Sequence, residues 1–219
     1  MIKLVIFDLD GTLLNTVDDL ADCTNHVLQK NGFPTHEVDA YKYFAGNGVA
    51  MLVERALPKG VETRHALSLL NDFMEYYEIH KSDKTAPYEG MTETLEKLQE
   101  KGILLAVATN KPHNLLPDLM VHYFPTIKWA AVFGNRKGVP IKPDPQIVYD
   151  ILAQCRDVAR NVSTNDILYV GDTAVDMETA QNAGITKVGA LWGFRTKEEL
   201  EQAHADYIIA HPQELISLI

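Results

Sequence analysis

The stretch Leu4-Val5-Ile6-Phe7-Asp8-Leu9-Asp10-Gly11-Thr12 lies near the start of this sequence of 219 residues. Its four consecutive apolar residues are typical of a parallel strand that is buried on both faces. Two aspartates follow the strand directly, and the simplest interpretation is a solvated Asp-Gly turn. If the chain bends at Leu9, however, Asp8 and Asp10 converge, while Gly11 permits close backbone approach. That arrangement would suit a carboxylate nucleophile beside a carboxylic acid.

The rest of the chain repeats the pattern of an apolar strand followed by an amphipathic helix. Strands are expected at 3–8, 103–109, 130–133, 167–170, 187–190 and 207–209. Helices are expected at 91–101, 113–122, 146–155, 174–183, 197–203 and 213–219. This alternation predicts an α/β fold, a doubly wound parallel sheet with a Rossmann-like core and helices on both faces. Ligands of such sheets bind at the carboxyl ends of the strands.

One long segment, residues 15–85, interrupts this alternation and contains no convincing strand. Its apolar residues recur at helical spacing and are separated by Gly-containing turns; they are Leu20, Val27, Leu28, Leu52, Val53, Leu57, Leu69, Leu70, Phe73 and Tyr77. We therefore expect an all-helical domain over residues 15–85, inserted into a core formed by residues 1–14 and 86–219. The two linkers between them could act as one hinge.

A second acidic motif, Gly171-Asp172-Thr173-Ala174-Val175-Asp176, follows the strand expected at 167–170. Asp172 would project from the strand end, and Asp176 would lie one helical turn further on the same side. A helix cap explains one of these aspartates. It does not explain a second one four residues on, where like charges disfavour the helix.

Taken together, Asp8, Asp10, Asp172 and Asp176 need a counter-charge. Two unit charges 4 Å apart interact with about 4 kcal/mol at an effective dielectric constant of 20. A hard divalent cation removes this repulsion, and sites of a few carboxylates suit Mg²⁺. The sequence places no His or Cys at metal-ligand spacing, which argues against zinc.

Two weaker candidates lie between the acidic motifs. Thr109 and Asn110 end the strand expected at 103–109, where a hydroxyl and a backbone N–H can bind phosphoryl oxygens. Lys142 offers a single positive charge. For either one alone, an ordinary surface residue is the simpler interpretation, but their order between Asp8 and Asp172 favours a shared site.

The composition excludes several classes of protein. The 20 basic and 30 acidic residues leave a net charge of −10, which argues against a nucleic-acid partner because phosphate contacts need clustered Lys and Arg. No apolar run approaches the roughly 18 residues that span a bilayer. Two cysteines make no disulfide framework, and the first residues do not resemble a secretory signal. We therefore expect a cytoplasmic protein.

With all four motifs in this order, the sequence resembles the haloacid dehalogenase superfamily. Three further stretches resemble its phosphoglycolate phosphatase group: Gly46-Asn47-Gly48 with residues 52–57, Pro87-Tyr88-Glu89-Gly90, and residues 176–180. The resemblance implies a helical cap between the first two motifs. It also implies a Mg²⁺-dependent phosphatase that hydrolyses a small phosphomonoester such as 2-phosphoglycolate.

The resemblance further implies a role for each matching residue. Asp8 would attack phosphorus and become an aspartyl phosphate, and Asp10 would serve first as acid and then as base. Thr109, Asn110 and Lys142 would hold the transferring oxygens and neutralise their charge.

The metal site is implied in the same way. Mg²⁺ would be held by the Asp8 carboxylate, the Asp10 backbone carbonyl and Asp172, while Asp176 would orient metal-bound water. This assignment makes Mg²⁺ the expected cofactor.

Residues of the expected cap are more ambiguous. The loop with Asn47 and Gly48 could reach over the site and bind the substrate through backbone N–H groups, or it could be an ordinary interhelical loop. Arg55 could bind a substrate carboxylate, although a solvated Arg on a helix face is the simpler interpretation. His113 is expected at the surface.

Two other functions stay open. A phosphosugar mutase of the same superfamily is one, although Gly171-Asp172-Thr173 resembles the phosphatases more closely. A non-catalytic binding protein that retains the fold is the other. A dehalogenase is disfavoured because that branch lacks the carboxylate that Asp10 supplies. We expect a monomer or a weak homodimer.

Overall fold

The computed structural model describes residues 1–155 and 162–219, and its centre is a six-stranded sheet in the order β5-β4-β1-β6-β7-β8. All neighbouring strands in this sheet run parallel. The strands are β1 Leu4–Phe7, β4 Leu104–Pro112, β5 Trp129–Asn135, β6 Ile167–Gly171, β7 Thr186–Ala190 and β8 Tyr207–Ile209. The chain adds β4 and β5 on one side of β1, then crosses over and adds β6 on the other side. The carboxyl ends of β1, β4 and β6 therefore surround a switch point, where ligands bind in such sheets.

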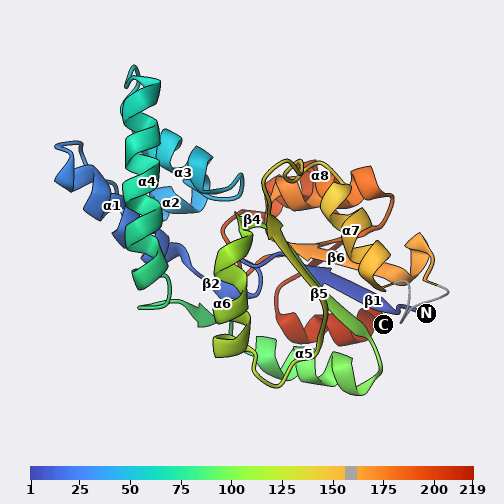
Figure 1. The fold of residues 1–219 in the computed structure, drawn as a ribbon. Helices are drawn as coiled ribbons and strands as arrows, with labels where there is room; N and C mark the ends of the chain where they lie inside the picture. The colour runs from blue at the N-terminus through green and yellow to red at the C-terminus, as the bar shows by residue number, and fades with distance from the viewer. Residues whose placement is uncertain (156–161) are drawn as a thin grey trace.

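Helices cover both faces of the sheet (Figure 1). The four residues of β1 are fully buried and alternate between two hydrophobic clusters, because successive side chains of a strand point to opposite faces. One cluster includes residues of α5 and α6, and the other includes residues of α7 and α8. The bounds are α5 Met91–Glu100, η1 His113–Leu115, α6 Leu116–Tyr123, α7 Gln146–Cys155, η2 Thr164–Asp166, α8 Ala174–Ala183, α9 Lys197–Gln202 and η3 Pro212–Leu218.

The four helices between β2 (Leu14–Asn15) and β3 (Ala86–Pro87) form a separate layer at the carboxyl ends of the strands (Figure 1). They are α1 Val17–Lys30, α2 Val38–Phe44, α3 Val49–Ala56 and α4 Thr63–His80. Their apolar stripes meet in a hydrophobic cluster that includes Leu20, Leu52 and Phe73, and Leu115 and Phe194 of the core pack into the same cluster. The predicted fold class, an α/β sheet with an inserted helical cap, is confirmed.

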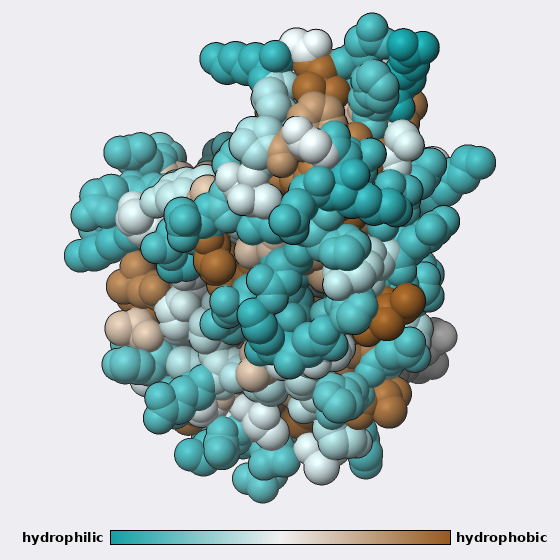
Figure 2. Space-filling view, turned by 90° about the vertical axis from the view of Figure 1, so that its left-hand side faces the viewer, coloured by the Kyte–Doolittle hydropathy of each residue, from teal (hydrophilic) through white to brown (hydrophobic). Residues whose placement is uncertain are grey.

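The outer face of the cap is hydrophilic over most of its area, with hydrophobic residues in separate small groups (Figure 2). Among the described helices, none has the length and apolar character needed to cross a membrane.

The two connections between cap and core run side by side. β2 (Leu14–Asn15) pairs antiparallel with β3 (Ala86–Pro87). Asp19, on the first turn of α1, is buried and accepts hydrogen bonds from the backbone N–H groups of Lys84 and Thr85, at 2.9 and 2.8 Å. Its Oδ2 also accepts a bond of 2.7 Å from the Thr85 hydroxyl. We propose residues 15–85 as the cap, with this pair of strands as the hinge.

Replacing Asp19 tests how strongly this tie stabilises the protein. Asp19→Ala should lower the free energy of unfolding by about 3 kcal/mol, because it leaves buried donors of Thr85 without an acceptor. Asp22→Ala is the matched control, since the Asp22 carboxylate lies on the same helix and makes an exposed ion pair with Lys84. Urea unfolding should show a large loss for the first variant and little change for the second. Equal losses would mean that the tie is not a special stabilising contact.

Two helix predictions were wrong in detail. The helix expected at 113–122 is divided into η1 and α6, because Pro117 in the first turn favours a new helix start there. The helix expected at 213–219 is the 3₁₀ helix η3. Its buried residues Pro212 and Leu215 are three apart, and this spacing keeps them on one face of a 3₁₀ helix.

Candidate active site

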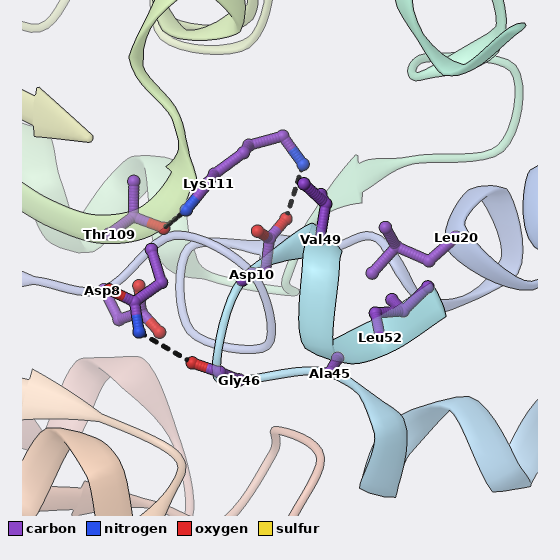
Figure 3. A pocket seen from close by; sticks show the side chains of 11 residues that line it. Asp8, Asp10, Leu20, Ala45, Gly46, Val49, Leu52, Thr109 and Lys111 are labelled. Carbon is purple, nitrogen blue, oxygen red and sulfur yellow. Dashed lines mark hydrogen bonds and ion pairs between the residues drawn. The ribbon is translucent and has the colours of Figure 1, made fainter. Parts of the chain in front are cut away.

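Three carboxylates meet at the carboxyl ends of β1 and β6, which are neighbours in the sheet. Asp8 follows β1, Asp172 follows β6, and Asp176 lies in the first turn of α8. One oxygen from each lies within 4.8 Å of the others, and all three residues are buried. Asp10, the fourth predicted carboxylate, turns its side chain away from this cluster toward Lys111 (Figure 3).

Hydrogen bonds fix the two carboxylates that follow β6. Asp172 accepts from the Thr12 hydroxyl at 2.9 Å and from the Phe194 backbone N–H at 2.7 Å. Asp176 accepts from the backbone N–H and the hydroxyl of Thr173, the residue that caps α8. The helix cap is thus Thr173, which leaves Asp172 free of that structural role.

Gly11 is required where the loop after β1 passes Asp172. Its φ of +85° lies in the region that favours glycine, and a Cβ there would come within 2.3 Å of Asp172 Oδ2. Any larger residue would displace the carboxylate.

Lys142 is the cation of the carboxylate cluster. Its Nζ lies 2.9 Å from Oδ1 of Asp8 and 2.7 Å from Oδ1 of Asp176, and it also donates to the Ala108 carbonyl. The surface alternative for Lys142 is wrong, because only 1% of its side chain is exposed. Burial alone would lower its pKa, but Asp176 and Asp8 outweigh burial and raise it well above the ordinary value. Lys142 is therefore a permanent positive charge.

One lysine does not neutralise three buried carboxylates. Burial raises the pKa of Asp8 to about 7, and Asp176 contributes to the rise although Lys142 opposes it. Burial together with Asp176 and Asp8 also raises the pKa of Asp172 well above its usual range. Among the described residues, the Lys142 ammonium 2.9 Å away is the ion-pair partner of Asp8 Oδ1, and no further group donates a hydrogen bond to this buried oxygen. Three buried carboxylates with a single lysine beside them fit a hard divalent cation.

A pocket opens above the carboxylates, between the core and the cap (Figure 3). Its polar side comes from the core, and its apolar side comes mainly from α1, α3 and the loop before α3. The lining residues are Asp8, Asp10, Thr109, Asn110, Lys111, Leu20, Ala45, Gly46, Gly48, Val49 and Leu52. The space between these walls, including its open mouth, is about 400 Å³.

Thr109 and Asn110 both line this pocket, but they differ in which of their polar groups are free to bind a ligand. The Asn110 amide donates to the carbonyls of Gly46 and Lys142 and accepts from the Lys142 backbone N–H. It therefore joins β4 to the cap loop and to the Lys142 loop. The Thr109 hydroxyl accepts from the Lys111 N–H at 3.1 Å, and a hydroxyl in that state can still donate to a ligand.

Comparison with known proteins identifies the family. The model of the haloacid dehalogenase-like hydrolases matches residues 5–190. The chain belongs to this family. A phosphoglycolate phosphatase of Vibrio cholerae is 31% identical over 94% of this chain and 92% of its own length. One of Mannheimia succiniciproducens is 30% identical over 99% and 98% of the two chains.

Solved structures of the family show the same fold. A predicted phosphoglycolate phosphatase from Haemophilus somnus is 28% identical, with a TM-score of 0.88 over 99% of this chain and 97% of its own. A protein from Lactobacillus delbrueckii is 29% identical, with a TM-score of 0.89 over 99% and 98% of the chains. The predicted resemblance is confirmed, and the chain is a hydrolase of this family.

The cap residues singled out in the sequence divide into two groups. Gly48 lines the pocket, whereas Asn47 does not. The Asn47 side chain accepts a hydrogen bond of 2.7 Å from Arg55, which also donates to the carbonyl of Phe44. Arg55 is exposed, so its place on a solvated helix face is confirmed, but its guanidinium holds the loop that forms one pocket wall. His113 begins η1 and is half-buried, and its ring accepts a hydrogen bond from the Gly134 N–H.

Lys111 is a pocket residue that the sequence reasoning did not single out. Its side chain is 1% exposed, and its Nζ donates to Asp10 Oδ1 at 2.9 Å and to the Tyr77 hydroxyl at 2.5 Å. A signal was present, since Lys111 directly follows Thr109 and Asn110 at the end of an apolar strand. Nothing local, however, marks Asp10 or Tyr77 as its partners.

Proposed function

We propose that this enzyme is a Mg²⁺-dependent phosphatase that hydrolyses a small phosphomonoester, similar to phosphoglycolate, through an aspartyl phosphate on Asp8. The observation that carries the proposal is the place of Asp8. Its carboxylate lies at the bottom of a pocket, beside the buried Lys142 and the other carboxylates. Asp10 lies at the same pocket, two residues further along the chain.

In the first step, a carboxylate oxygen of Asp8 attacks phosphorus and forms an acyl phosphate. The bond between phosphorus and the substrate's ester oxygen breaks, and Asp10 gives a proton to the leaving alkoxide. Lys142 neutralises charge on the transferring oxygens, and the Thr109 hydroxyl donates to one of them. Because the Asn110 side chain is already engaged, Asn110 would contribute its backbone N–H.

In the second step, Asp10 takes a proton from a water molecule that attacks the same phosphorus atom. The bond from phosphorus to the Asp8 oxygen breaks, which releases inorganic phosphate and restores the carboxylate. Asp10 is thus acid and then base, and each step returns it to the state that the next step needs.

Mg²⁺ fits the buried carboxylates. Asp8, Asp172 and the Asp10 backbone carbonyl would hold it, with Asp176 beside them, tied to Lys142. Bound there, the ion would supply the positive charge that both the carboxylates and a phosphoryl group need.

The pocket supports a small substrate. The cap builds its outer wall, and the enclosed cavity between the cap and the core is only about 30 Å³, so the pocket has little room for a bulky leaving group. Relatives from Vibrio cholerae and Mannheimia succiniciproducens that match nearly this whole chain are named phosphoglycolate phosphatases. Together these observations favour 2-phosphoglycolate and similar small organic phosphates over a phosphoprotein.

A phosphate-release assay tests this function. Purified protein with Mg²⁺ should release inorganic phosphate from 2-phosphoglycolate faster than from a panel of other phosphorylated metabolites, and EDTA should stop the release. A phosphoryl group that passes to a second sugar phosphate instead of water would favour a mutase. No turnover of any phosphomonoester would favour a binding protein.

The loop held by Arg55 should affect substrate choice more than chemistry. Asn47→Ala and Arg55→Ala should each lower kcat/KM for 2-phosphoglycolate by about fivefold, and less for p-nitrophenyl phosphate, because the pocket wall loosens while Asp8 and Lys142 are unchanged. Since Arg55 donates to Asn47, the double variant should lose little more than either single one. Kinetics on both substrates check this prediction. Equal losses on the two substrates would show that the loop supports catalysis or folding instead.

A further inference from the structure

A polar chain of three residues connects the cap to the acid/base of the reaction. Tyr77 belongs to α4 of the cap, Lys111 to β4 of the core, and Asp10 to the loop after β1. The Lys111 ammonium donates to Tyr77 and to Asp10, and it also lies 4.7 Å from the centre of the Tyr77 ring. Lys111 and Tyr77 are buried, whereas the Asp10 carboxylate is 19% exposed and lines the pocket.

Lys111 stays positively charged and is hydrogen-bonded on both sides, to Asp10 and to Tyr77. Its pKa would fall through burial, but Asp10 and Tyr77 more than compensate and raise it above the ordinary value. The side chain therefore stays a cation whose position is set by the oxygens of Asp10 and Tyr77. Charge-assisted bonds of this kind are shorter and stronger than neutral ones.

We propose that Lys111 is a positioning residue that holds the Asp10 carboxylate in its working orientation, and that Tyr77 makes this depend on the cap lying against the core. The inference rests on the proposed function, because it assigns Asp10 the acid/base role. Lys111 touches neither phosphorus nor the leaving group in this assignment and acts through Asp10.

Among the hydrogen bonds that the described residues make between the cap and the core, the one made by Tyr77 is the one that connects to Asp10. Asn110 binds the carbonyl of Gly46, and Arg195 binds the carbonyl of Ala45 at 3.0 Å, so both hold the loop before α3. Tyr77, in contrast, binds the Lys111 ammonium, and the same ammonium binds Asp10. If the cap moves away, the Lys111 ammonium loses one of its oxygen partners and the Asp10 carboxylate becomes less constrained. The acid/base is then best placed when the pocket is covered, where proton transfer is sheltered from bulk water.

The decisive comparison uses two buried tyrosines of the cap. Tyr77→Phe removes the hydroxyl at Lys111 and retains the ring. Tyr41→Phe removes the hydroxyl of another fully buried tyrosine, which donates to Asn25 within the cap. We expect Tyr77→Phe to lower kcat for 2-phosphoglycolate about tenfold, with KM within about twofold, and Tyr41→Phe to change kcat little. Thermal unfolding of both variants shows that the comparison concerns folded proteins.

A burst experiment separates positioning from general damage. With p-nitrophenyl phosphate, the leaving group needs no proton, so attack by Asp8 stays fast, whereas hydrolysis of the aspartyl phosphate still needs Asp10. Lys111→Met should therefore release about one equivalent of p-nitrophenolate per enzyme rapidly, followed by turnover roughly 100-fold slower than wild type. Lys111→Arg should recover part of the rate because it restores the positive charge.

The outcomes are distinct. Equal kcat values for Tyr77→Phe and Tyr41→Phe would overturn the role of Tyr77. A slow Lys111→Met enzyme without a burst, or one as fast as wild type, would overturn the role of Lys111. Wild-type protein that hydrolyses no phosphomonoester would overturn the proposed function and this inference with it.

Discussion

Asp8→Asn should abolish turnover, lowering kcat for every phosphomonoester by about 1000-fold or more. An amide in place of the carboxylate cannot supply the oxygen that attacks phosphorus, and the other residues of the pocket do not replace it. The fold should survive, because Asn fills the same buried space and removes a carboxylate that is costly there. Steady-state kinetics and thermal unfolding of the variant check both parts. More than a few per cent of wild-type activity in Asp8→Asn would rule out the covalent mechanism.

Asp10→Asn is the companion variant, and it should fail for a different reason. Its Asp8 is intact, so an aspartyl phosphate can still form with p-nitrophenyl phosphate, whose leaving group needs no proton, but water is no longer activated and the intermediate persists. Mass spectrometry of protein mixed with p-nitrophenyl phosphate should find a phosphoryl group on Asp8 in this variant and none in Asp8→Asn. A phosphoryl group on any other residue would contradict the assignment of the nucleophile.

Mg²⁺ should stabilise the folded protein strongly, by about 2.7 kcal/mol at one hundred times its dissociation constant. The reason is the repulsion among three buried carboxylates that share one lysine. Asp172→Ala should remove most of the gain, since it deletes a proposed ligand. The melting temperature with and without Mg²⁺ measures the effect. A wild-type melting temperature that does not change when Mg²⁺ is added would argue against a shared metal site.

The same carboxylates give a pH dependence with a defined sign. In the unfolded chain Asp8 ionises near pH 4, whereas in the folded protein its pKa is about 7. Between these values the folded state binds more protons, so stability without metal should fall as the pH rises from 4 to 7. Asp172, whose pKa is also raised, acts in the same direction. The lowered pKa values of Asp150 and Asp166 act only in more acidic solution.

Melting temperatures in EDTA at pH 5 and pH 8 measure this slope. The protein should melt at a lower temperature at pH 8, and Mg²⁺ should restore stability there more than at pH 5. Asp8→Asn in EDTA should show a smaller slope because it removes one of the raised carboxyl groups. If wild type and Asp8→Asn show the same slope, other groups dominate the pH dependence.

Much of this protein could be predicted from local patterns. The apolar run of β1, the alternation of strands and helices, and the helical spacing of the insert predicted the fold class. These patterns can be recognised in the sequence alone, because a buried parallel strand needs consecutive apolar residues and a buried helix face needs them three or four apart. The sites of Asp8 and Asp172 followed as well, since carboxyl ends of neighbouring parallel strands meet at one edge of the sheet.

Tertiary structure alone decided which side chains are engaged with one another. Asn110 and Lys142 lie near the carboxylates. Only the fold shows that the Asn110 side-chain amide is hydrogen-bonded to Gly46 and Lys142. Only the fold shows, too, that Lys142 is buried between Asp8 and Asp176. Lys111 is the clearest case. Its partners, Tyr77 and Asp10, lie 34 and 101 residues away. No local spacing encodes such a contact, because it depends on how the cap is set against the sheet, and that placement is determined by packing across the whole chain.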